Sequence, residues 1–404
     1  MTTPGKRHAA GFPVFSVVFT PSPERVLVGG GGGATKAGVK NAVVRAQPAA
    51  AASRRAPRAL PHAPPPPVPA QILYDVVPTE LELSVVSEYL LAKDDDGCMH
   101  IAIHPKEKSL VAAVNSPEAA IAAGNNRNCR VFLIQKSRLR FVQGVKTTDS
   151  VDATNYQKSA RFSPDGKLLC TGTTDGRFSM WSWPDMAPAF PPLELGSEIM
   201  DIQFDPAVSS VGLVTPGVLR LIDTEKAKVR WELAKQVVGT ENCDFRALRF
   251  GIKSTQGILF VVLNARSRKA AFIQKYSVKD KKLISSKSVS LKPITAFSLS
   301  ADGSTMAFGS SDLSLNVLNA KTLTRIARFQ NAHDFPSTAL DINSTNTVVV
   351  SGSADGTLFV ASVPPIANDS TAGSYTTVWL LVVAVLLIVL LILVGMADSS
   401  GGEL

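Results

Sequence analysis

The chain has 404 residues, of which 45% are hydrophobic and 19% are charged. This composition supports a packed globular core and excludes a mostly disordered chain. The net charge of +9 would suit an acidic partner, but the basic residues are scattered and form no tract of five or more. That scatter favours a solvated surface, so we expect no nucleic-acid partner.

The chain opens with MTTPGKRHAAGFPVF, which lacks an apolar stretch long enough for a signal peptide. From Phe15 the sequence FSVVFTPSPERVLVGGGGG fits a strand, a turn and a second strand that ends in five consecutive glycines, Gly29 to Gly33. Ordering five glycines costs much conformational entropy. The run is therefore either a flexible connector between two strands or a loop that something holds in place.

The glycine run does not fit a phosphate-binding loop. A Walker A loop needs G-x-x-x-x-G-K-[ST], but here Gly33-Ala-Thr-Lys-Ala-Gly38 is followed by Val39 and then Lys40, with no hydroxyl after the lysine. The next residues, VKNAVVRA, read as a strand, whereas a dinucleotide fingerprint needs a helix there. We therefore expect no directly bound nucleotide or other small-molecule substrate. Converging backbone carbonyls of such a loop would instead suit a cation.

Residues 46–70, AQPAAAASRRAPRALPHAPPPPVPA, consist almost entirely of Ala, Pro and Arg. Such a segment cannot bury enough apolar surface to offset the entropy of ordering it. We predict a disordered insertion here.

The rest of the chain repeats one unit, seen best in ARFSPDGKLLCTGTTDGRFSMW from Ala160 to Trp181. This unit reads as three strands joined by two-residue turns at Asp165-Gly166 and Asp175-Gly176. Related units follow from one end of the chain to the other. The apolar residues just before their first turns are Phe19, Ile103, Phe162, Phe204, Phe250, Leu299 and Ile342.

The last four intervals between these residues are 42, 46, 49 and 43, close to the blade length of about 40–45 residues in WD-type repeats. The pattern predicts an all-β fold, a seven-bladed WD-repeat β-propeller over residues 1–366. The segment Ser116–Arg130 is expected to be an extended loop.

The sequence offers little for covalent catalysis. It holds no GxSxG or HExxH motif, and no histidine lies in sequence near a nucleophile and an acid. His104 and His333 fall at turn-like positions, where a structural role is expected. The four cysteines show neither CxxC nor zinc-ligand spacing, so we expect buried, reduced thiols at Cys98, Cys129, Cys170 and Cys243. The protein is therefore not expected to be an enzyme in the covalent sense.

Near its end the chain reads VWLLVVAVLLIVLLILV over residues 378–394, without a charged residue. A stretch of this length that is apolar on every side predicts a transmembrane helix, over residues 377–396. It would follow a linker at 367–376 and precede a short lumenal tail at 397–404. The short span suits the endoplasmic reticulum (ER), with the N-terminal domain in the cytosol.

Together, the propeller repeats, the pattern V-x-G-G-G-G-x-x-x-x-G-x-x-N ending at Asn41 and the apolar C-terminal stretch resemble one family. These are the ER-membrane guanine-nucleotide exchange factors of the Sec-twelve type, related to the prolactin regulatory element-binding protein. The resemblance runs from about Phe15 to Met396. It implies a regulatory exchange factor that loads GTP on the Sar-type small GTPase and so starts COPII vesicle formation for ER-to-Golgi transport.

The resemblance also implies roles for single residues. In that family a potassium ion holds the glycine-rich loop, which contacts the GTPase near its nucleotide site. Here the ion would lie in the segment from Gly30 to Lys36, on backbone oxygens. The exchange loop would be formed by the residues that follow. Gly38 would allow the return turn, Asn41 would fix the base of the loop or touch the GTPase, and Val39 and Lys40 would flank that contact. The potassium loop so implied comprises Gly30, Gly31, Gly32, Gly33, Ala34, Thr35 and Lys36.

Two other functions stay open on the sequence alone. The chain could be a membrane-anchored WD-repeat scaffold without exchange activity, its glycine loop merely flexible. Sequence-specific DNA binding is the third, suggested by the mammalian relative's name and the basic charge. The apolar span and the missing basic tract argue against it.

Overall fold

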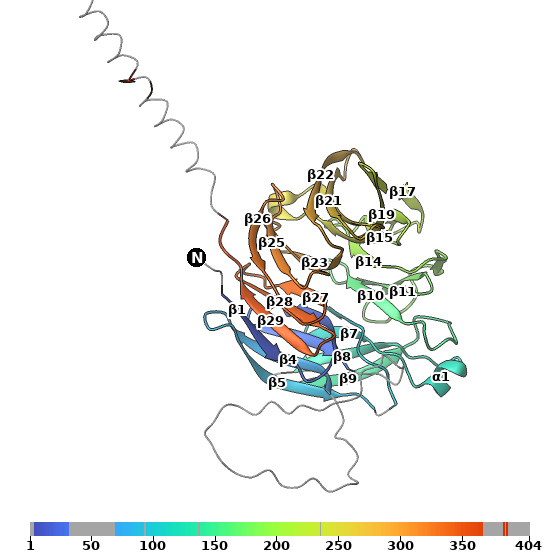
Figure 1. Ribbon diagram of the computed structural model, residues 1–404. Coiled ribbons are helices and arrows are strands. Elements are labelled where there is room, and N and C mark those ends of the chain that lie inside the picture. Colours follow the sequence, from blue (N-terminus) through green and yellow to red (C-terminus); the bar gives the residue numbers. More distant parts are fainter. Residues whose placement is uncertain are drawn as a thin grey trace, which may run out of the picture. The chain divides into compact units, whose positions relative to one another are not determined.

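The computed structural model describes residues 4–31, 69–92, 94–135, 138–234, 236–366, 383 and 385–386. The chain divides into two units, Met1–Pro364 and Pro365–Leu404. In the first unit the described strands form seven antiparallel sheets, and their innermost strands gather around a common centre (Figure 1). The predicted seven-bladed β-propeller is confirmed.

Each blade begins with an innermost strand. These strands are β2 (Val14–Phe19), β6 (His100–Ile103), β10 (Gln157–Phe162), β14 (Asp201–Phe204), β19 (Glu241–Phe250), β23 (Ile294–Leu299) and β27 (Ser337–Ile342). Every one of them ends at an apolar residue that the repeat pattern singled out. These seven residues therefore mark the same turn in all seven blades.

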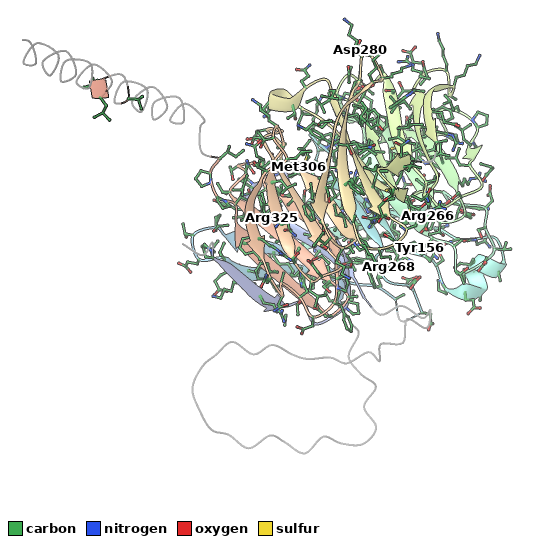
Figure 2. The ribbon with its side chains drawn as sticks, turned by 45° about the horizontal axis from the view of Figure 1, so that its top comes forward. Tyr156, Arg266, Arg268, Asp280, Met306 and Arg325 are labelled. Atoms are coloured by element: carbon green, nitrogen blue, oxygen red, sulfur yellow. The ribbon has the colours of Figure 1, made fainter. Side chains whose placement is uncertain are left out.

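The second strands are almost wholly buried, because both of their faces lie between neighbouring sheets. They are β3 (Arg25–Gly30), β7 (Ser109–Ala113), β11 (Leu168–Thr173), β15 (Ser210–Val214), β20 (Ile258–Ala265), β24 (Thr305–Ser310) and β28 (Val348–Ser353). Their sequences are therefore made mostly of small and apolar residues, without the alternation of polar and apolar residues that a half-exposed strand shows. Figure 2 shows the side chains that fill the space between the sheets, with Met306 of β24 among them.

The third and fourth strands complete each blade. The third strands are β4 (Pro69–Val77), β8 (Cys129–Gln135), β12 (Arg177–Ser182), β16 (Val218–Asp223), β21 (Ala271–Ser277), β25 (Leu315–Asn319) and β29 (Thr357–Ser362). The fourth strands are β5 (Glu82–Leu90), β9 (Arg138–Val145), β13 (Leu193–Glu194), β17 (Val229–Ala234), β22 (Leu283–Ser290) and β26 (Arg325–Phe329). A short extra strand, β18 (Gln236–Val238), pairs with the start of β19.

The fourth strand of the last blade comes from the other end of the chain. Strand β1 (Gly5–Ala9) pairs antiparallel with β29, with Gly5 opposite Ala361 and Ala9 opposite Thr357. The ring is therefore closed by hydrogen bonds between the first and the last strands of the propeller.

Polar contacts join the innermost strands all the way round. On one side of the ring the Ile101 amide donates to Ser16 Oγ over 2.9 Å, and a ring nitrogen of His100 lies 3.1 Å from the carbonyl oxygen of Ala160. Arg161 lies 3.8 Å from a carboxylate oxygen of Asp201. These contacts link β2 to β6, β6 to β10 and β10 to β14.

The other side of the ring is joined in the same way. Asp201 accepts from the Leu248 amide over 3.1 Å, and Arg249 donates to the carbonyl of Phe297 over 2.9 Å. Asp341 then accepts from Ser298 Oγ and from the Phe19 amide, each over 2.9 Å. All seven neighbouring pairs of blades are thus joined by at least one polar contact near the axis.

Three details of the sequence prediction are corrected. The Asp-Gly turns are longer than two residues: Phe162 pairs with Leu169, and Gly172 pairs with Phe178. Only their glycines have positive φ, 81° at Gly166 and 90° at Gly176. The Ser116–Arg130 segment holds a short helix, α1 (Glu118–Ala122), and the start of β8. Strand β4 begins at Pro69, so the last two residues of the predicted insertion belong to it.

The rest of segment 46–70 lies outside the described residues, as does nearly all of the predicted span 377–396. In the part of the chain that is described, no helix is both long enough and apolar enough to cross a membrane.

Candidate functional site

The glycine run leaves the propeller from the first blade. Gly29 and Gly30 are the last residues of β3, where Gly29 pairs with Ser16 on β2 and with Gln71 on β4. The run therefore begins the connection between the second and third strands of this blade. Gly30 pairs with Val14, the first residue of the innermost strand. The connection thus leaves the face on which the innermost strands begin, opposite to the face on which β29 ends.

Close packing explains why the strand ends in glycines. A Cβ on Gly29 would lie 2.7 Å from both Cys98 Sγ and Ile101 Cδ1, and a Cβ on Gly30 would lie 2.0 Å from the carbonyl oxygen of Pro13. Real Cβ atoms do not approach other atoms so closely. Gly31 has a φ of 115°, which side chains rarely allow. These three glycines thus form a built base and not a loose connector.

Hydrogen bonds fix this base from two sides. The Gly31 amide donates to the Pro13 carbonyl over 2.9 Å, and the Cys98 amide donates to the Gly30 carbonyl over 2.8 Å. Pro13 precedes the first blade, whereas Cys98 precedes the second. The carbonyl oxygen of Gly31 lies against Gly97, where a Cβ would come within 2.7 Å of it. A glycine at 97 therefore leaves room for that oxygen.

Acidic residues lie beside the base, in the connection from the first blade to the second. Asp94, Asp95 and Asp96 precede Gly97 directly. The Asp95 carboxylate is held by both terminal nitrogens of Arg130, each at 2.6 Å, and Asp96 accepts from the Gly97 amide over 2.8 Å. These contacts fix the turn that lies against Gly31, and Arg130 compensates the charge of Asp95.

Gly31 is the last described residue before residue 69. The other residues named for the two loops lie outside the described residues: Gly32, Gly33, Ala34, Thr35 and Lys36 for potassium, and Gly38, Val39, Lys40 and Asn41 for exchange. Their roles stay predictions. Of the two carbonyls that are described, Gly30 offers an oxygen that already accepts the Cys98 amide. Gly31 offers a neutral backbone oxygen of the kind that suits a potassium ion.

The histidines have structural roles, as predicted. His104 is buried, accepts two backbone amides at Nδ1 and contacts the Gly166 carbonyl through Nε2 at 3.0 Å. His333 is buried between Thr357 Oγ1 at 2.7 Å and Ser351 Oγ at 2.8 Å. Burial lowers the pKa of His333 to about 4, so that its ring is neutral at pH 7.

The four cysteines are free and buried, as expected. Burial raises the pKa of Cys98 and of Cys129 to about 12 and also raises that of Cys170. Such thiols are protonated at neutral pH and therefore poor nucleophiles and metal ligands. Cys98 instead packs against the base of the glycine run.

The partners of the glycine base were not among the predicted site residues. Pro13 and Gly97 lie 17 and 67 residues from Gly30 and belong to connections between blades, so no local motif points to them. The only signal is the run Asp94–Gly97, which marks a tight turn.

Comparison with known proteins agrees with the fold. The family described as "WD domain, G-beta repeat" matches residues 150–182 and 324–361. SED4 of Candida glabrata is 22% identical over 304 residues, 71% of this chain and 27% of the relative. SEC12-like protein 2 of Arabidopsis thaliana is 22% identical over 260 residues, 63% of this chain and 62% of the relative.

A third relative, the guanine nucleotide-exchange factor SEC12 of Candida glabrata, is 23% identical over 318 residues, 74% of this chain and 65% of the relative. The chain thus matches between about a quarter and two-thirds of the length of these relatives. The chain carries WD40 repeats, and proteins named SEC12, SEC12-like and SED4 are its homologues, which confirms the resemblance seen in the sequence.

Proposed function

We propose that this protein is a guanine-nucleotide exchange factor for a Sar-type small GTPase at the ER membrane, and that it thereby initiates COPII vesicle formation. Two of the homologues carry exchange factor in their names. The observation that carries the proposal most directly is the built base at Gly29–Gly31. There the glycine run of the Sec-twelve type leaves a propeller blade from a fixed position.

The proposed activity needs no covalent chemistry. An exchange factor that binds the nucleotide-free GTPase more tightly than the GDP-bound form lowers the affinity for GDP by the same factor and speeds its release. Gly38 would turn the chain back, and Val39, Lys40 and Asn41 would contact the GTPase near its nucleotide. A rigid base favours this role, because a loop that is already ordered loses less entropy when it binds.

A potassium ion would stiffen the loop beyond its base. The ligands would be backbone oxygens between Gly31 and Lys36, and the ion would contribute charge neutralisation and order to them. Exchange activity should then depend on the monovalent cation in the buffer.

The apolar stretch 377–396 would anchor the propeller to the ER membrane after a short linker, with residues 397–404 in the lumen. Activation at the bilayer would load the GTPase where an amphipathic helix exposed on GTP binding can insert.

The test is a nucleotide-exchange assay. Full-length protein in detergent would be added to a purified Sar-type GTPase loaded with fluorescent GDP, in potassium and then in sodium buffer. We expect faster GDP release in potassium than in sodium. Asn41→Ala should slow release, whereas Asn125→Ala, an exposed asparagine in the loop that follows α1, should not.

The outcomes separate the alternatives. No acceleration over the GTPase alone would reject exchange activity and leave the scaffold function. Equal rates in the two buffers would reject the potassium loop only. Full activity of Asn41→Ala would reject the role of that residue only.

A further inference from the structure

The turns that join the third and fourth strands have the same geometry in the fourth, fifth and sixth blades. They follow Asp223, Ser277 and Asn319, the last residues of β16, β21 and β25. In each turn the backbone amide four residues later donates to the carbonyl of that strand residue, over 3.1, 2.8 and 2.8 Å. The three turns are thus fixed in equivalent conformations, and they lie at the same end of their blades.

Exposed lysines gather on these three turns, which we call the basic turns. Among the described residues, none of the lysine ammonium groups takes part in an ion pair. The acidic residues of the basic turns are Glu225 and Asp280, and Asp280 accepts the hydroxyl of Ser277 over 2.8 Å. The corresponding connections of the first and third blades carry Glu80 and Asp185 and no lysine. The lysines of the basic turns are Lys226, Lys228, Lys279, Lys281, Lys282 and Lys321.

Side-chain contacts between blades show that the basic turns lie side by side. Lys281 Nζ of the fifth blade donates to the carbonyl of Arg230 in the fourth blade, over 3.0 Å. On the other side of the same blade, Lys287 Nζ donates to the carbonyl of Thr322 in the sixth blade, over 3.3 Å. The lysines of three blades therefore belong to one continuous surface.

Exposed aliphatic side chains flank these lysines. Leu283 and Ile284 follow Lys282 directly and are 50% and 56% exposed, and Val229 follows Lys228 and is 49% exposed. Lysines beside exposed aliphatic groups suit a membrane interface, where the ammonium groups meet anionic headgroups and the aliphatic groups reach the acyl boundary. An acidic protein surface would match the lysines but would offer nothing to the aliphatic groups.

The chain leaves the propeller at the same end of the blades. Strand β29 is the third strand of the last blade, so its end at Ser362 takes the position that the basic turns have in their blades. Figure 2 shows Asp280 and Arg268 at opposite ends of the fifth blade. The glycine base lies at the end marked by Arg268, because both belong to connections from a second to a third strand.

From this combination we propose that the basic turns form a docking surface for anionic phospholipids. The lysines would contact the headgroup phosphates, and Leu283 and Ile284 would enter the boundary between headgroups and acyl chains. The inference rests on the proposed membrane anchor, which would follow β29 and keep this surface near the bilayer, so that individually weak contacts suffice. Docking would turn the glycine base towards the cytosol, from which a GDP-bound GTPase arrives.

Docking can be tested with the full-length chain reconstituted in vesicles. A dye would be attached to Thr322→Cys in the basic turn of the sixth blade, or to Ser267→Cys at the opposite end of the fifth blade. Both positions are exposed, whereas the four native cysteines are buried. Quenching by lipids with nitroxide-labelled headgroups would be measured in phosphatidylcholine vesicles with and without phosphatidylserine.

We expect stronger quenching at position 322 than at position 267. The excess should require phosphatidylserine and should fall at high salt, because salt screens the attraction between lysines and headgroups. Equal quenching of the two dyes, or an excess that does not depend on phosphatidylserine, would overturn the proposal.

Two sets of variants locate the docking surface. A lysine near an anionic surface contributes about fivefold in affinity, so Lys226→Gln, Lys279→Gln and Lys282→Gln together should lower the ratio of docked to undocked protein about a hundredfold. The matched control is Arg268→Gln with Lys269→Gln, two exposed cations at the opposite end of the fifth blade. This pair should leave the ratio unchanged, and an equal loss in both sets would overturn the proposal.

Ile284→Ser separates a membrane from an acidic protein as the partner. It removes apolar surface without changing the charge, so it should lower the ratio of docked to undocked protein about tenfold. Unchanged docking of this variant would favour an acidic protein and overturn the assignment to lipid.

Two further measurements distinguish failure of this inference from failure of the proposed function. A chain that does not float with phosphatidylcholine vesicles lacks the anchor, which would reject both the anchor and the docking surface. Flotation without excess quenching would reject the docking surface alone. In detergent the triple lysine variant should release GDP from the GTPase at the wild-type rate, and a slower rate would assign the basic turns to the GTPase contact instead.

Discussion

A single methyl group added at Gly30 should disturb the base of the glycine run more than any other small change nearby. The new Cβ would lie 2.0 Å from the Pro13 carbonyl oxygen and 2.8 Å from two ring atoms of Phe12. The closest of these atoms belongs to backbone, which cannot rotate away as a side chain can. The end of β3 would have to move by about an ångström, and overpacking of this kind costs about 1–3 kcal/mol.

Gly217→Ala is the matched control. Gly217 lies in the corresponding connection of the fourth blade, where a Cβ would meet no atom within 4 Å. Its backbone also has no positive φ. Alanine there should change the free energy of unfolding by no more than about 0.5–1 kcal/mol, and in the stabilising direction.

Urea unfolding of the full-length chain in detergent, followed by tryptophan fluorescence, would compare the two variants. We expect Gly30→Ala to be less stable than wild type by about 2 kcal/mol, with slower nucleotide exchange because the loop leaves from a displaced base. If Gly30→Ala and Gly217→Ala unfold at the same urea concentration, the base is not packed as described. If only exchange is lost, the base serves the loop and not the stability of the blade.

Three further predictions concern a buried histidine, a buried ion pair and the buried cysteines. The pKa of His333 is lowered to about 4 from its ordinary value of 6.5. The unfolded chain therefore binds the proton more readily, and the free energy of unfolding should fall as the pH drops from 6.5 towards 4. The urea midpoint should depend less on pH in His333→Gln than in the wild type. Asp201→Asn would leave Arg249 without its buried partner and should lower the free energy of unfolding by about 3–5 kcal/mol. The control is Asp244→Asn, which removes the partner of the exposed Arg266 and should lower it by about 1 kcal/mol or less. A thiol reagent should label none of Cys98, Cys129 and Cys170 in the folded protein and all of them in urea, and rapid labelling before unfolding would contradict their burial.

The repeat pattern predicted the fold because each blade solves the same packing problem. An apolar residue must end the innermost strand and small residues must fill the second, so Phe162 and Gly172 have counterparts in other blades. Turn lengths were predicted less well. Ser163 Oγ accepts the Leu168 amide over 2.9 Å and donates to Asp165 over 2.5 Å, which stabilises a longer turn than the Asp-Gly pair alone suggests.

Contacts between blades could not be predicted from one sequence. The segment Gly5–Ala9 reads GKRHA and shows no alternation of polar and apolar residues. It is a strand because it pairs with β29, more than 340 residues away in the sequence. For the same reason no motif linked Gly31 to Gly97. The candidate exchange loop was recognised by its glycines, whereas the packing that holds its first residues depends on two connections distant in sequence.

The pairing of β1 with β29 has a consequence for biosynthesis. Among the described strands β1 comes earliest in the chain, yet its partner is Thr357–Ser362, so the ring stays open until that segment has been made. Until then the edge of β1 is unpaired, and such an edge is a site for wrong association. Strand β1 therefore completes the ring only when the last blade is present, and a nascent chain cut short before β29 leaves β1 without its partner strand.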